Sequence, residues 1–454
     1  MRKPNLIGKL REGLLAPARS LLDQLIKLAD SRGLPVYLVG GPLRDLLLDR
    51  LSLDLDIAVE GDAPELARQL AESLSRENKA GSARPEALVG RAAATTSEPR
   101  VVAHAAFLTA TVRIPAFHLD LITARSETYR RPGALPTVTP ATIEGDLLRR
   151  DFTINALALR LNSPRRGEIL DPSGGRADLE ARVIRVLHER SFEDDATRIL
   201  RAVRYASRFG FEIEPQTLDW LKRDVRYLET ISGARLHHEL ARIFAEDAPE
   251  EILRRLHDLG ALAAIHAALR FRPPQANSFT RLRELNATGA RAAYWPVLAW
   301  RLSEPQALDL ARRLAATKPQ REAMAAMPGL PRLGPKLARS SLKRSAIAET
   351  LAPFPLPALC ALAALTEDPT IRNRLLDYLT KTRYERPLFT GEDLLALGVP
   401  ESPQLGEILR RLRNALLDRE ATTREDEEHL ARQLIAEGDK ARRHTKNTTP
   451  SHSS

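Results

Sequence analysis

The sequence predicts an α+β protein in which a mixed N-terminal unit of strands and helices precedes a long all-helical remainder. Two observations predict this division. Short runs that alternate apolar and polar residues, typical of strands, lie between helix-type segments over about the first 150 residues. From about residue 178 to residue 437 the strand signals vanish, and segments rich in Ala, Leu and Arg follow with helical periodicity. With 454 residues, 43% of them hydrophobic, the chain is long enough for several domains.

The N-terminal elements follow from local patterns. Residues 18–32 predict a helix, and PVYLVGG predicts a short strand that ends in a Gly-Gly turn. Pro42 can open the next helix, PLRDLLLD, because a missing N–H costs little at a first helical position. LDLDIAVEG alternates and contains Ile and Val, which predicts a strand, and APELARQLAESLSRE predicts a helix. Residues 78–100 have no clean period and are expected to form a flexible insertion.

Two further strands, VVAHAAFLTATVRI and AFHLDLITAR, are predicted before a Pro- and Gly-rich loop at about 129–147. DLLRRDFTINALALRL follows and turns from basic to apolar. The final stretch, DKARRHTKNTTPSHSS, is polar and is expected to be disordered. Helices are predicted at 194–209, 215–224, 234–246, 249–259, 293–316, 335–350, 356–365, 369–382, 391–397, 403–417 and 423–437.

The net charge, the lack of long apolar runs and the cysteine count limit the classes of protein to which the chain can belong. The formal net charge of +10 favours a polyanionic partner such as nucleic acid, although a generic basic surface gives the same balance. No run of 18 apolar residues exists and the N-terminus has no continuous apolar segment, so neither a membrane span nor a signal peptide is expected. The single cysteine, Cys360, excludes an internal disulfide and a Cys-based zinc site, and we expect it to be buried. A cytoplasmic location fits these features.

Asp54 and Asp56 form an acidic pair within a predicted strand. Residues two apart on a strand project from the same face, so the two carboxylates lie side by side while Leu55 and Ile57 point into a core. Paired carboxylates can bind Mg²⁺ together with substrate phosphates, and such ions stabilise phosphoryl transfer. The alternative is an edge strand with a solvated acidic face, which is the commoner meaning of an isolated Asp-x-Asp.

The surroundings of the acidic pair favour a phosphate site. Gly40 and Gly41 end a strand and begin a helix, where exposed N–H groups attract phosphate. Arg44 is placed for a triphosphate, and Asp45 can orient it. A Gly-Gly turn alone is a weak signal, but the turn, the Arg-Asp pair and the acidic strand occur in order within a short segment.

Together, LVGGPLRD and DLDIAVEG resemble the head of the nucleotidyltransferase superfamily that includes DNA polymerase β. More closely, they resemble bacterial-type tRNA nucleotidyltransferases (CCA-adding enzymes) and their poly(A) polymerase relatives. The resemblance implies a polymerase β-like head with a mixed sheet, followed by an all-α neck, body and tail. The implied parts are a head at 1–175, a neck with a nucleotide-selecting motif at 176–270, a body at 271–385, a tRNA-binding tail at 386–438 and a disordered end at 439–454.

DLLRRDFTINALAL resembles the family's second motif, which handles the ribose and triphosphate. The resemblance implies nucleotide-binding roles for Arg149, Arg150, Asp151 and Asn155. Adjacent arginines supply forked donors for phosphate, and a carboxylate can accept a bond from a ribose hydroxyl. The alternative is a helix N-terminus capped by Asp151, and the same residue can do both.

SFEDDATRILRAVRYASRFGF resembles the motif that selects the incoming base, with Asp194 where the family usually has Glu. Asp195 and Arg198 are three apart, so we expect them to be neighbours on one helical face that addresses the Watson–Crick edge of cytosine or adenine. Arg201 and Arg204 continue this stripe toward the triphosphate. The alternative is an intrahelical ion pair on a solvated basic face.

Other segments carry weaker signals. DPSGGRADLEARVIRVL resembles the connector between head and neck, whose glycines permit bending. In ISGARLHHELARIF, Ala234 replaces the family's usual Glu, and Arg235 and Glu239 are expected to brace helices. Residues 389–437 resemble the family's C-terminal helices, where Arg410, Arg411 and Arg413 either contact RNA or form a solvated face. The isolated His257-Asp258 pair is interpreted as structural.

Asp120, in FHLDLITARSETY, lies on a strand in register to approach the acidic pair. It could be a third acidic group that acts as a general base for the attacking hydroxyl. The alternative is a structural Asp beside Arg125.

The resemblance implies a template-independent enzyme that builds or repairs the 3′-terminal CCA of tRNA from CTP and ATP and releases pyrophosphate. Its implied partners are Mg²⁺, held by Asp54 and Asp56, and the tRNA acceptor end. The loop at 129–147 favours competence in adding A. The alternatives are a poly(A) polymerase, an enzyme that adds only A, and a non-catalytic RNA-binding relative, which would have no need of the acidic pair.

Overall fold

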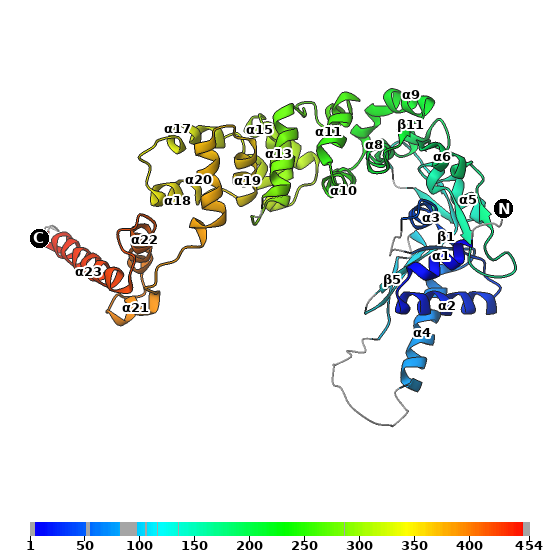
Figure 1. Cartoon of the computed structure of the whole chain (residues 1–454), viewed down its shortest axis with the longest axis horizontal. Coiled ribbons are helices and arrows are strands. Elements are labelled where there is room, and N and C mark those ends of the chain that lie inside the picture. Colours follow the sequence, from blue (N-terminus) through cyan, green and yellow to red (C-terminus); the bar gives the residue numbers. More distant parts are fainter. Residues whose placement is uncertain are drawn as a thin grey trace, which may run out of the picture. The chain divides into compact units, whose positions relative to one another are not determined.

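The computed structural model describes residues 5–50, 55–81, 98–104, 107–115, 117–134, 136–285 and 287–447. Asp54, most of the 78–100 insertion and the last seven residues lie outside this set. The chain divides into two compact units, one of Met1–Asp247 with Asp258–Ala264 and one of Ala248–His257 with Ile265–Ser454. The first unit contains a mixed sheet and the second is helical, which confirms the predicted α+β class (Figure 1).

The described residues of the first unit form a seven-stranded mixed sheet. Its order is β3-β4-β5-β2-β1-β8-β9, in which β2 and β5 pair in parallel and the other neighbours pair antiparallel. The strands are β1 (Val36–Val39), β2 (Asp56–Val59), β3 (Arg100–His104), β4 (Thr109–Ile114), β5 (Phe117–Thr123), β8 (Ala158–Arg160) and β9 (Ile169–Leu170).

Helices cover both faces of this sheet. On one face lie α2 (Ala16–Ser31) and α4 (Ala63–Gly81), which pack against β5 and its neighbours (Figure 1). On the other face, α5 (Ile143–Leu148) packs Ile143 and Leu147 against Tyr37, Val39 and Ala58. Leu55 and Ile57 are buried, as the alternation predicted. Because Asp56 is two residues from Ala58, it lies on the α5 face of the sheet.

A tight turn joins β1 to α3 (Gly41–Leu47). Gly40 has φ +69° and ψ −135°, a conformation that only glycine adopts readily. A Cβ at this position would also lie 2.7 Å from Nη1 of Arg150. Gly40 is therefore fixed both by its backbone conformation and by the guanidinium that lies against it. The short α1 (Leu6–Gly13) was not predicted.

The segment predicted as a flexible loop at 129–147 is partly regular. β6 (Arg125–Thr128) and β7 (Thr137–Pro140) pair antiparallel as a separate two-stranded sheet, and α5 begins at Ile143. Prolines and glycine obscured the strand in the sequence, although β7 itself contains the β-branched run Thr-Val-Thr. Gly133, between the strands, lies so close to the backbone oxygen of Thr230 that a Cβ would approach it to 2.5 Å.

The remainder of the first unit is mostly helical. Its elements are the 3₁₀ helix η2 (Thr153–Asn155), α6 (Gly175–Ala181), β10 (Val183–Ile184), α7 (Ser191–Asp194), α8 (Thr197–Phe209), β11 (Glu212–Ile213), α9 (Pro215–Asp224), η3 (Val225–Thr230) and α10 (Gly233–Phe244). The predicted single helix over 194–209 is wrong at its start, because Asp195 is extended (φ −144°, ψ 96°) and separates α7 from α8.

The second unit contains the helices predicted beyond residue 270, with more breaks than expected. In place of one helix over 293–316 there are α14 (Tyr294–Leu298) and α15 (Glu304–Arg313), because Ser303 and Gln306 form a capping box that starts a new helix. In place of one helix over 335–350 there are α17 (Gly334–Leu337) and α18 (Arg344–Leu351). The sequence reading missed α13 (Pro273–Glu284) and α16 (Lys318–Ala326).

The remaining helices agree more closely with the prediction. They are α11 (Pro249–Asp258), α19 (Leu356–Leu365), α20 (Pro369–Thr380), α21 (Gly391–Ala396), α22 (Pro403–Leu417) and α23 (Arg424–Asn447). The short helix α12 (Ala261–Ile265) and the 3₁₀ turns η4 (Arg291–Ala293), η5 (Leu330–Leu333) and η6 (Thr382–Tyr384) were not predicted. Because α23 runs to Asn447, helix extends past residue 438, where a disordered end was predicted. Cys360 on α19 is fully buried, as expected, and burial raises the pKa of its thiol to about 11.

In the part of the chain that the structure describes, no single helix is long and apolar enough to cross a membrane. Among the described residues, α18 and α19 taken together are the one helix pair with the required length and composition, and this pair is bent by 116°.

Gly175 provides a test of the packing between α6 and η2. A Cβ at this position would lie 2.1 Å from the backbone oxygen of Thr153, so the connector glycine is needed for close approach as well as for any bending. We expect Gly175→Ala to destabilise the first unit by at least about 2 kcal/mol, because backbone must move. Scanning calorimetry of the full chain measures this as a lowered transition temperature for that unit.

Gly406→Ala on α22 is the matched control. No atom lies within 4 Å of the position of its Cβ, so the substitution should stabilise the helix by up to about 1 kcal/mol. Equal transition temperatures for Gly175→Ala and wild type would show that α6 is not held against η2 as described.

Candidate active site

A cavity of about 590 Å³ lies in the first unit. It is lined from β5 and β6, from the segment that follows α5, and from α8 and α10. Six of the predicted nucleotide-binding residues line it, although they are up to about fifty positions apart in the chain: Arg149, Arg150, Asp151, Asp195, Arg198 and Arg201. The second and third sequence motifs therefore meet at one cavity.

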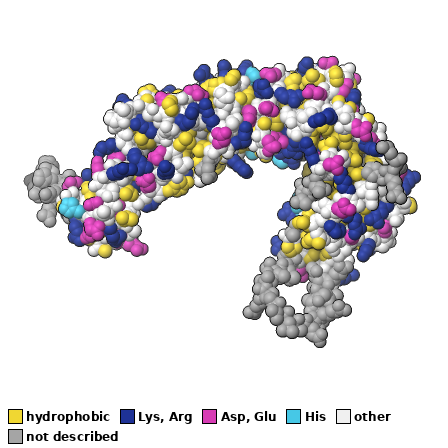
Figure 2. Space-filling model, in the orientation of Figure 1, with side chains coloured by type: hydrophobic (Ala, Val, Ile, Leu, Met, Phe, Trp, Pro, Cys, Tyr) yellow, Lys and Arg dark blue, Asp and Glu magenta, His cyan; other side chains and the backbone are white. Residues whose placement is uncertain are grey.

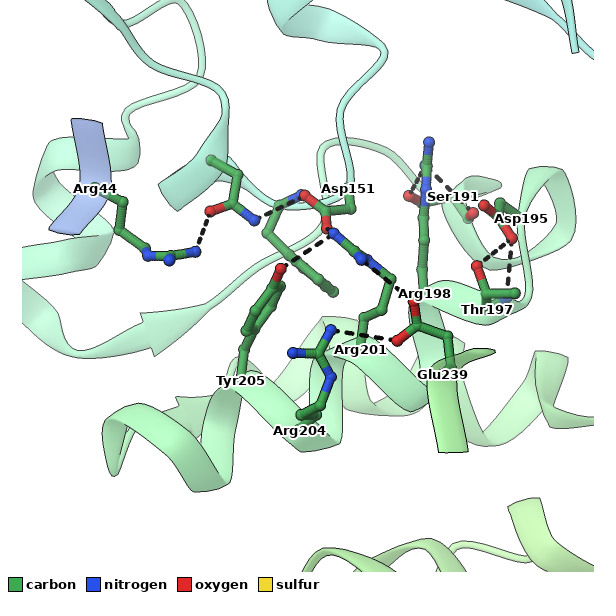
Figure 3. A network of polar contacts seen from close by, with 12 residues as sticks. Arg44, Asp151, Ser191, Asp195, Thr197, Arg198, Arg201, Arg204, Tyr205 and Glu239 are labelled. Atoms are coloured by element: carbon green, nitrogen blue, oxygen red, sulfur yellow. Dashed lines mark hydrogen bonds and ion pairs between the residues drawn. The ribbon is translucent and has the colours of Figure 1, made fainter. Parts of the chain in front are cut away.

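Asp151 is the centre of a polar network at this cavity (Figure 3). Its Oδ2 accepts bonds from Nη2 and Nε of Arg201 at 2.6 and 2.9 Å. Its Oδ1 accepts from Nδ2 of Asn155 at 2.9 Å and from the backbone N–H of Phe152 at 2.9 Å. Burial alone would raise the pKa of Asp151, but Arg201 and the bond from Asn155 outweigh it and lower the pKa to about 2. Asp151 is therefore ionised at neutral pH.

Asp195 and Arg198 both line the cavity, but they are not neighbours on one helical face as the spacing suggested. Asp195 precedes α8, where its Oδ1 accepts bonds from the backbone N–H and the hydroxyl of Thr197 at 3.0 and 2.6 Å. A short Asp at a helix start satisfies free N–H groups, which explains the break. Arg235 of α10 holds the same oxygen at 2.7 Å. Thus Arg235 braces α10 against the start of α8.

Arg198 is buried and is held by different groups (Figure 3). Its Nη1 donates to Oγ of Ser191 at 2.5 Å, and its Nη2 donates to the backbone oxygen of Arg149 at 2.8 Å. Helix α8 is thereby bonded to the segment that carries the second motif. A carboxylate acceptor from Asp195 and a guanidinium donor from Arg198 are thus both present on the cavity wall.

Arg204 does not line the cavity. Its guanidinium is buried, where it donates to Glu239 at 3.2 Å and to Glu246 at 3.4 Å and lies 4.7 Å from the ring centroid of Tyr205. Glu239 also contacts Nη1 of Arg201 at 3.5 Å, so it braces α10 against α8, as predicted. Arg204, the last of the three arginines spaced i, i+3 and i+6, therefore points away from the cavity, because Glu239 of α10 and Glu246 just after α10 compensate its charge.

Arg44 and Asp45 also lie outside the cavity lining. Asp45 Oδ1 accepts from Nε of Arg44 at 2.8 Å, and Nη1 of Arg44 donates to Asn155 at 2.7 Å. The Arg44 guanidinium lies 4.5 Å from the ring centroid of Phe209 and is only 4% exposed. These contacts connect the Gly40–Gly41 turn to η2 and α8. The predicted contact of Arg44 with triphosphate remains a prediction.

Asp56 and Asp120 are directly paired across the parallel strands β2 and β5. Ile122, two residues beyond Asp120, lines the cavity, so both carboxylates lie on the sheet face that bears the cavity. Oγ1 of Thr111 donates to Asp120 at 2.5 Å. Asp54 lies outside the described residues, and within those residues no group of three His, Cys, Asp or Glu side chains is arranged to hold a metal.

Sequence reasoning missed three residues of the site: Asp146, Glu127 and Tyr129. Asp146 has no exposed side-chain surface and forms ion pairs with Arg149 and Arg150 at 2.6 and 2.8 Å. Glu127 accepts from Arg149 at 2.7 Å and from the Tyr129 hydroxyl at 2.8 Å. The available signal was the i, i+3 and i, i+4 spacing of Asp146 to the two arginines. No comparable local spacing marks Glu127.

The tail arginines have protein partners in the second unit. Arg410 contacts Glu407 and Glu349, and Arg411 contacts Glu437 at 3.3 Å. Arg413 donates to the backbone oxygens of Thr382 and Glu385, and burial lowers the pKa of its guanidinium. Figure 2 shows Lys and Arg mixed with Asp and Glu over the visible face. Arg413 thus has a structural role, while Arg410 and Arg411 are about half-exposed.

Two sequence families match the part of the chain that contains the sheet and the helices that follow it. The family described as "Poly A polymerase head domain" matches residues 36–185, and the one described as "Probable RNA and SrmB- binding site of polymerase A" matches residues 210–270. These matches cover the sheet and most of the residues around the cavity. They define the class as nucleotidyltransferases of the polymerase A type.

Curated relatives specify the family further. An A-adding tRNA nucleotidyltransferase of Halalkalibacterium halodurans is 30% identical over 418 residues, which are 89% of this chain and 90% of that protein. One of Geobacter sulfurreducens is 33% identical over 453 residues, 96% of this chain but 49% of that protein, so this chain spans about half of its length. A CC-adding tRNA nucleotidyltransferase of Deinococcus radiodurans is 37% identical over 225 residues, 49% of this chain and 54% of that protein.

Solved structures show the same fold along most of the chain. A CCA-adding enzyme in apo form II has a TM-score of 0.75 at 28% identity and covers 95% of this chain and 99% of its own. The Thermotoga maritima CCA-adding enzyme complexed with tRNA has a TM-score of 0.69 at 27% identity and covers 95% and 98%. The chain therefore belongs to the tRNA nucleotidyltransferase and poly(A) polymerase family.

The Asp151–Arg201 pair makes a pH-dependent contribution to stability. A carboxyl whose folded pKa is about 2, below its unfolded value, stabilises the fold above the unfolded pKa and loses this contribution as the pH falls toward 2. We expect the difference in unfolding free energy between wild type and Asp151→Asn to shrink by about 1.5 kcal/mol between pH 6 and pH 2.5. Urea titrations at each pH measure it. A difference independent of pH would contradict the ion pair.

Proposed function

We propose that this chain is a template-independent tRNA nucleotidyltransferase that builds or repairs the 3′-terminal CCA with CTP and ATP. In this reaction the RNA 3′-hydroxyl attacks the α-phosphate of the nucleotide, and pyrophosphate leaves. The observation that carries the proposal is that the cavity unites Arg149, Arg150 and Asp151 with Asp195 and Arg198. Guanidinium donors for phosphate and a donor–acceptor pair for a base edge are both present there.

The proposed roles follow from position. Arg150 and Arg201 bring positive charge to the cavity, which favours the triphosphate and its developing negative charge. Asp195 accepts and Arg198 donates at the Watson–Crick edge, so protein groups take the place of a template. The anchoring of Asp195 by Arg235 and of Arg198 by Ser191 fixes the spacing between acceptor and donor. That preorganisation supports selection of one base over another.

Asp54 and Asp56 are proposed to hold Mg²⁺, which when bound neutralises triphosphate charge and polarises the α-phosphate. The residues present suit such an ion, because two acidic residues, Asp56 and Asp120, lie side by side on adjacent strands of the cavity-bearing face. Asp120 is proposed to accept the proton of the attacking hydroxyl. The bond from Thr111 fixes the orientation of its carboxylate for that role.

The helical elements are proposed to bind the tRNA acceptor region through its shape and phosphates. The formal net charge of +10 supports a polyanionic partner. Among the solved structures above, one is a complex with tRNA, and another similar structure is a CCA-adding enzyme complexed with CTP, at a TM-score of 0.72 and 29% identity.

Addition of the terminal A alone is the second candidate function. The two relatives that match the largest shares of this chain among those described above are both A-adding enzymes. Within one chain, the two activities use the same cavity and differ in whether CTP is also accepted. The choice is therefore a question of nucleotide selection rather than of fold.

Transcripts of one tRNA that end before CCA, after C and after CC distinguish these activities. With CTP and ATP supplied separately and together, we expect ordered addition of C, C and A that then stops. Addition of one A to the CC-ending transcript without any use of CTP would identify the A-only enzyme. Unlimited A addition to any RNA would contradict both in favour of poly(A) synthesis.

Asp54→Ala and Asp56→Ala test the metal assignment. We expect each to lower nucleotide incorporation by at least about a thousandfold, because a phosphoryl transfer loses several kcal/mol of charge stabilisation. tRNA affinity in a filter-binding assay should change less than about threefold, since phosphate contacts elsewhere carry it. Incorporation at the wild-type rate by either variant would remove that residue from the reaction.

A further inference from the structure

The buried carboxylate of Asp146 contacts both arginines of the second motif. Its Oδ1 accepts from Nη2 and Nε of Arg149 at 2.6 and 3.1 Å. Its Oδ2 accepts from Nη2 and Nε of Arg150 at 2.8 and 3.2 Å. The exposed fraction of Asp146 is 0%. One carboxylate therefore holds two guanidinium groups, with one oxygen for each.

Arg149 is held toward the base-selecting side of the cavity. Its Nη1 donates to Oε1 of Glu127 at 2.7 Å, and its Nε also donates to the backbone oxygen of Arg125 at 3.0 Å. Its own backbone oxygen accepts the 2.8 Å bond from Arg198. Arg149 thus connects α5, β6 and α8, and most of its guanidinium edge is engaged by protein groups.

Arg150 is held toward the Gly40 turn. Its Nη1 lies 2.7 Å from the position that a Cβ would take at Gly40, so the guanidinium covers the turn that precedes α3. Arg150 also lines the cavity. Whereas Arg149 is engaged by Glu127 and a backbone oxygen, the contacts of Arg150 with Asp146 use only Nε and Nη2, and Nη1 extends toward the turn.

We propose that Asp146 is a positioning residue that gives the two adjacent arginines different tasks. Asp146 holds the Arg150 guanidinium where it can bind the nucleotide triphosphate. It holds Arg149 where the backbone oxygen of Arg149 accepts the bond from Arg198. Two neighbouring arginines at the end of a short helix repel each other, and each side chain can adopt many rotamers. Charge-assisted bonds to one buried carboxylate offset the repulsion and restrict each arginine to one rotamer. This inference rests on the proposed function for the identity of the ligand.

The equilibrium dissociation constant for ATP with Mg²⁺, measured by calorimetry without RNA, tests the inference. Asp146→Asn keeps the shape but offers one acceptor oxygen for two guanidinium groups, so we expect ATP to bind at least about tenfold more weakly. Asp224→Asn is the matched control, since Asp224 is also buried, pairs with Arg223 alone at 2.8 Å and does not line the cavity. It should lose stability but keep ATP affinity within about twofold.

A double-mutant cycle separates positioning from general stabilisation. If Asp146 acts on ATP through Arg150, then Asp146→Asn should weaken ATP binding less than about threefold in an Arg150→Ala background. If Asp146 has a merely structural role, the factors by which Asp146→Asn and Arg150→Ala weaken ATP binding should multiply in the double mutant. Multiplied losses, or wild-type ATP affinity in Asp146→Asn, would overturn the inference.

The two arginines provide a second test that leaves Asp146 unchanged, in case Asp146→Asn does not fold. Arg150→Gln should weaken ATP binding at least about tenfold, whereas Arg149→Gln should weaken it less than about threefold and change the preference between ATP and CTP. Equal losses in the two variants contradict the division of tasks. A chain that binds ATP with this pattern but adds nothing to tRNA would refute the proposed function alone.

Discussion

The ion pair between Asp151 and Arg201 is the interaction on which the rest of the site depends. It joins the segment after α5 to α8, and both side chains are largely buried, with 11% of Asp151 and 23% of Arg201 exposed. Removing one partner of a buried pair typically costs about 3–5 kcal/mol, because the other charge is left uncompensated. Asn155, Tyr205 and Glu239 also bond to the pair, which therefore links η2, α8 and α10 on one side of the cavity.

Acidic side chains hold the arginines around the cavity in place. The first unit places Asp146, Glu127, Glu239 and Glu246 behind the arginines of the second and third motifs. Arg204, paired with Glu239 and Glu246, is fully buried and does not line the cavity. Arg149, Arg150 and Arg201 are also paired with acidic groups, but they line the cavity. The acidic residues therefore fix the positions of the positive charges that a nucleotide meets.

The sequence predicted the division into a mixed unit and a helical unit, because apolar residues recur with a period of two in strands and of 3.6 in helices. It also identified six residues of the cavity wall through motifs. It could not predict that Asp195 leaves the helix, since one carboxylate can pair along a helix or cap its start with the same spacing. Nor could it find Glu127, whose partner Arg149 meets it only after β6 and α5 have packed together.

Because Asp195 sits between two helices and not within one, two backbone dihedral angles and the bond to Arg235 determine where its carboxylate lies. A rigid helical turn would have locked the distance between Asp195 and Arg198 into the covalent geometry of α8. Here that distance depends on the bonds of Asp195 to Thr197 and also on Arg235, a neighbour on α10. Under the proposed function, the choice of nucleotide is therefore open to evolutionary change through Arg235, while Asp195 and Arg198 themselves stay the same.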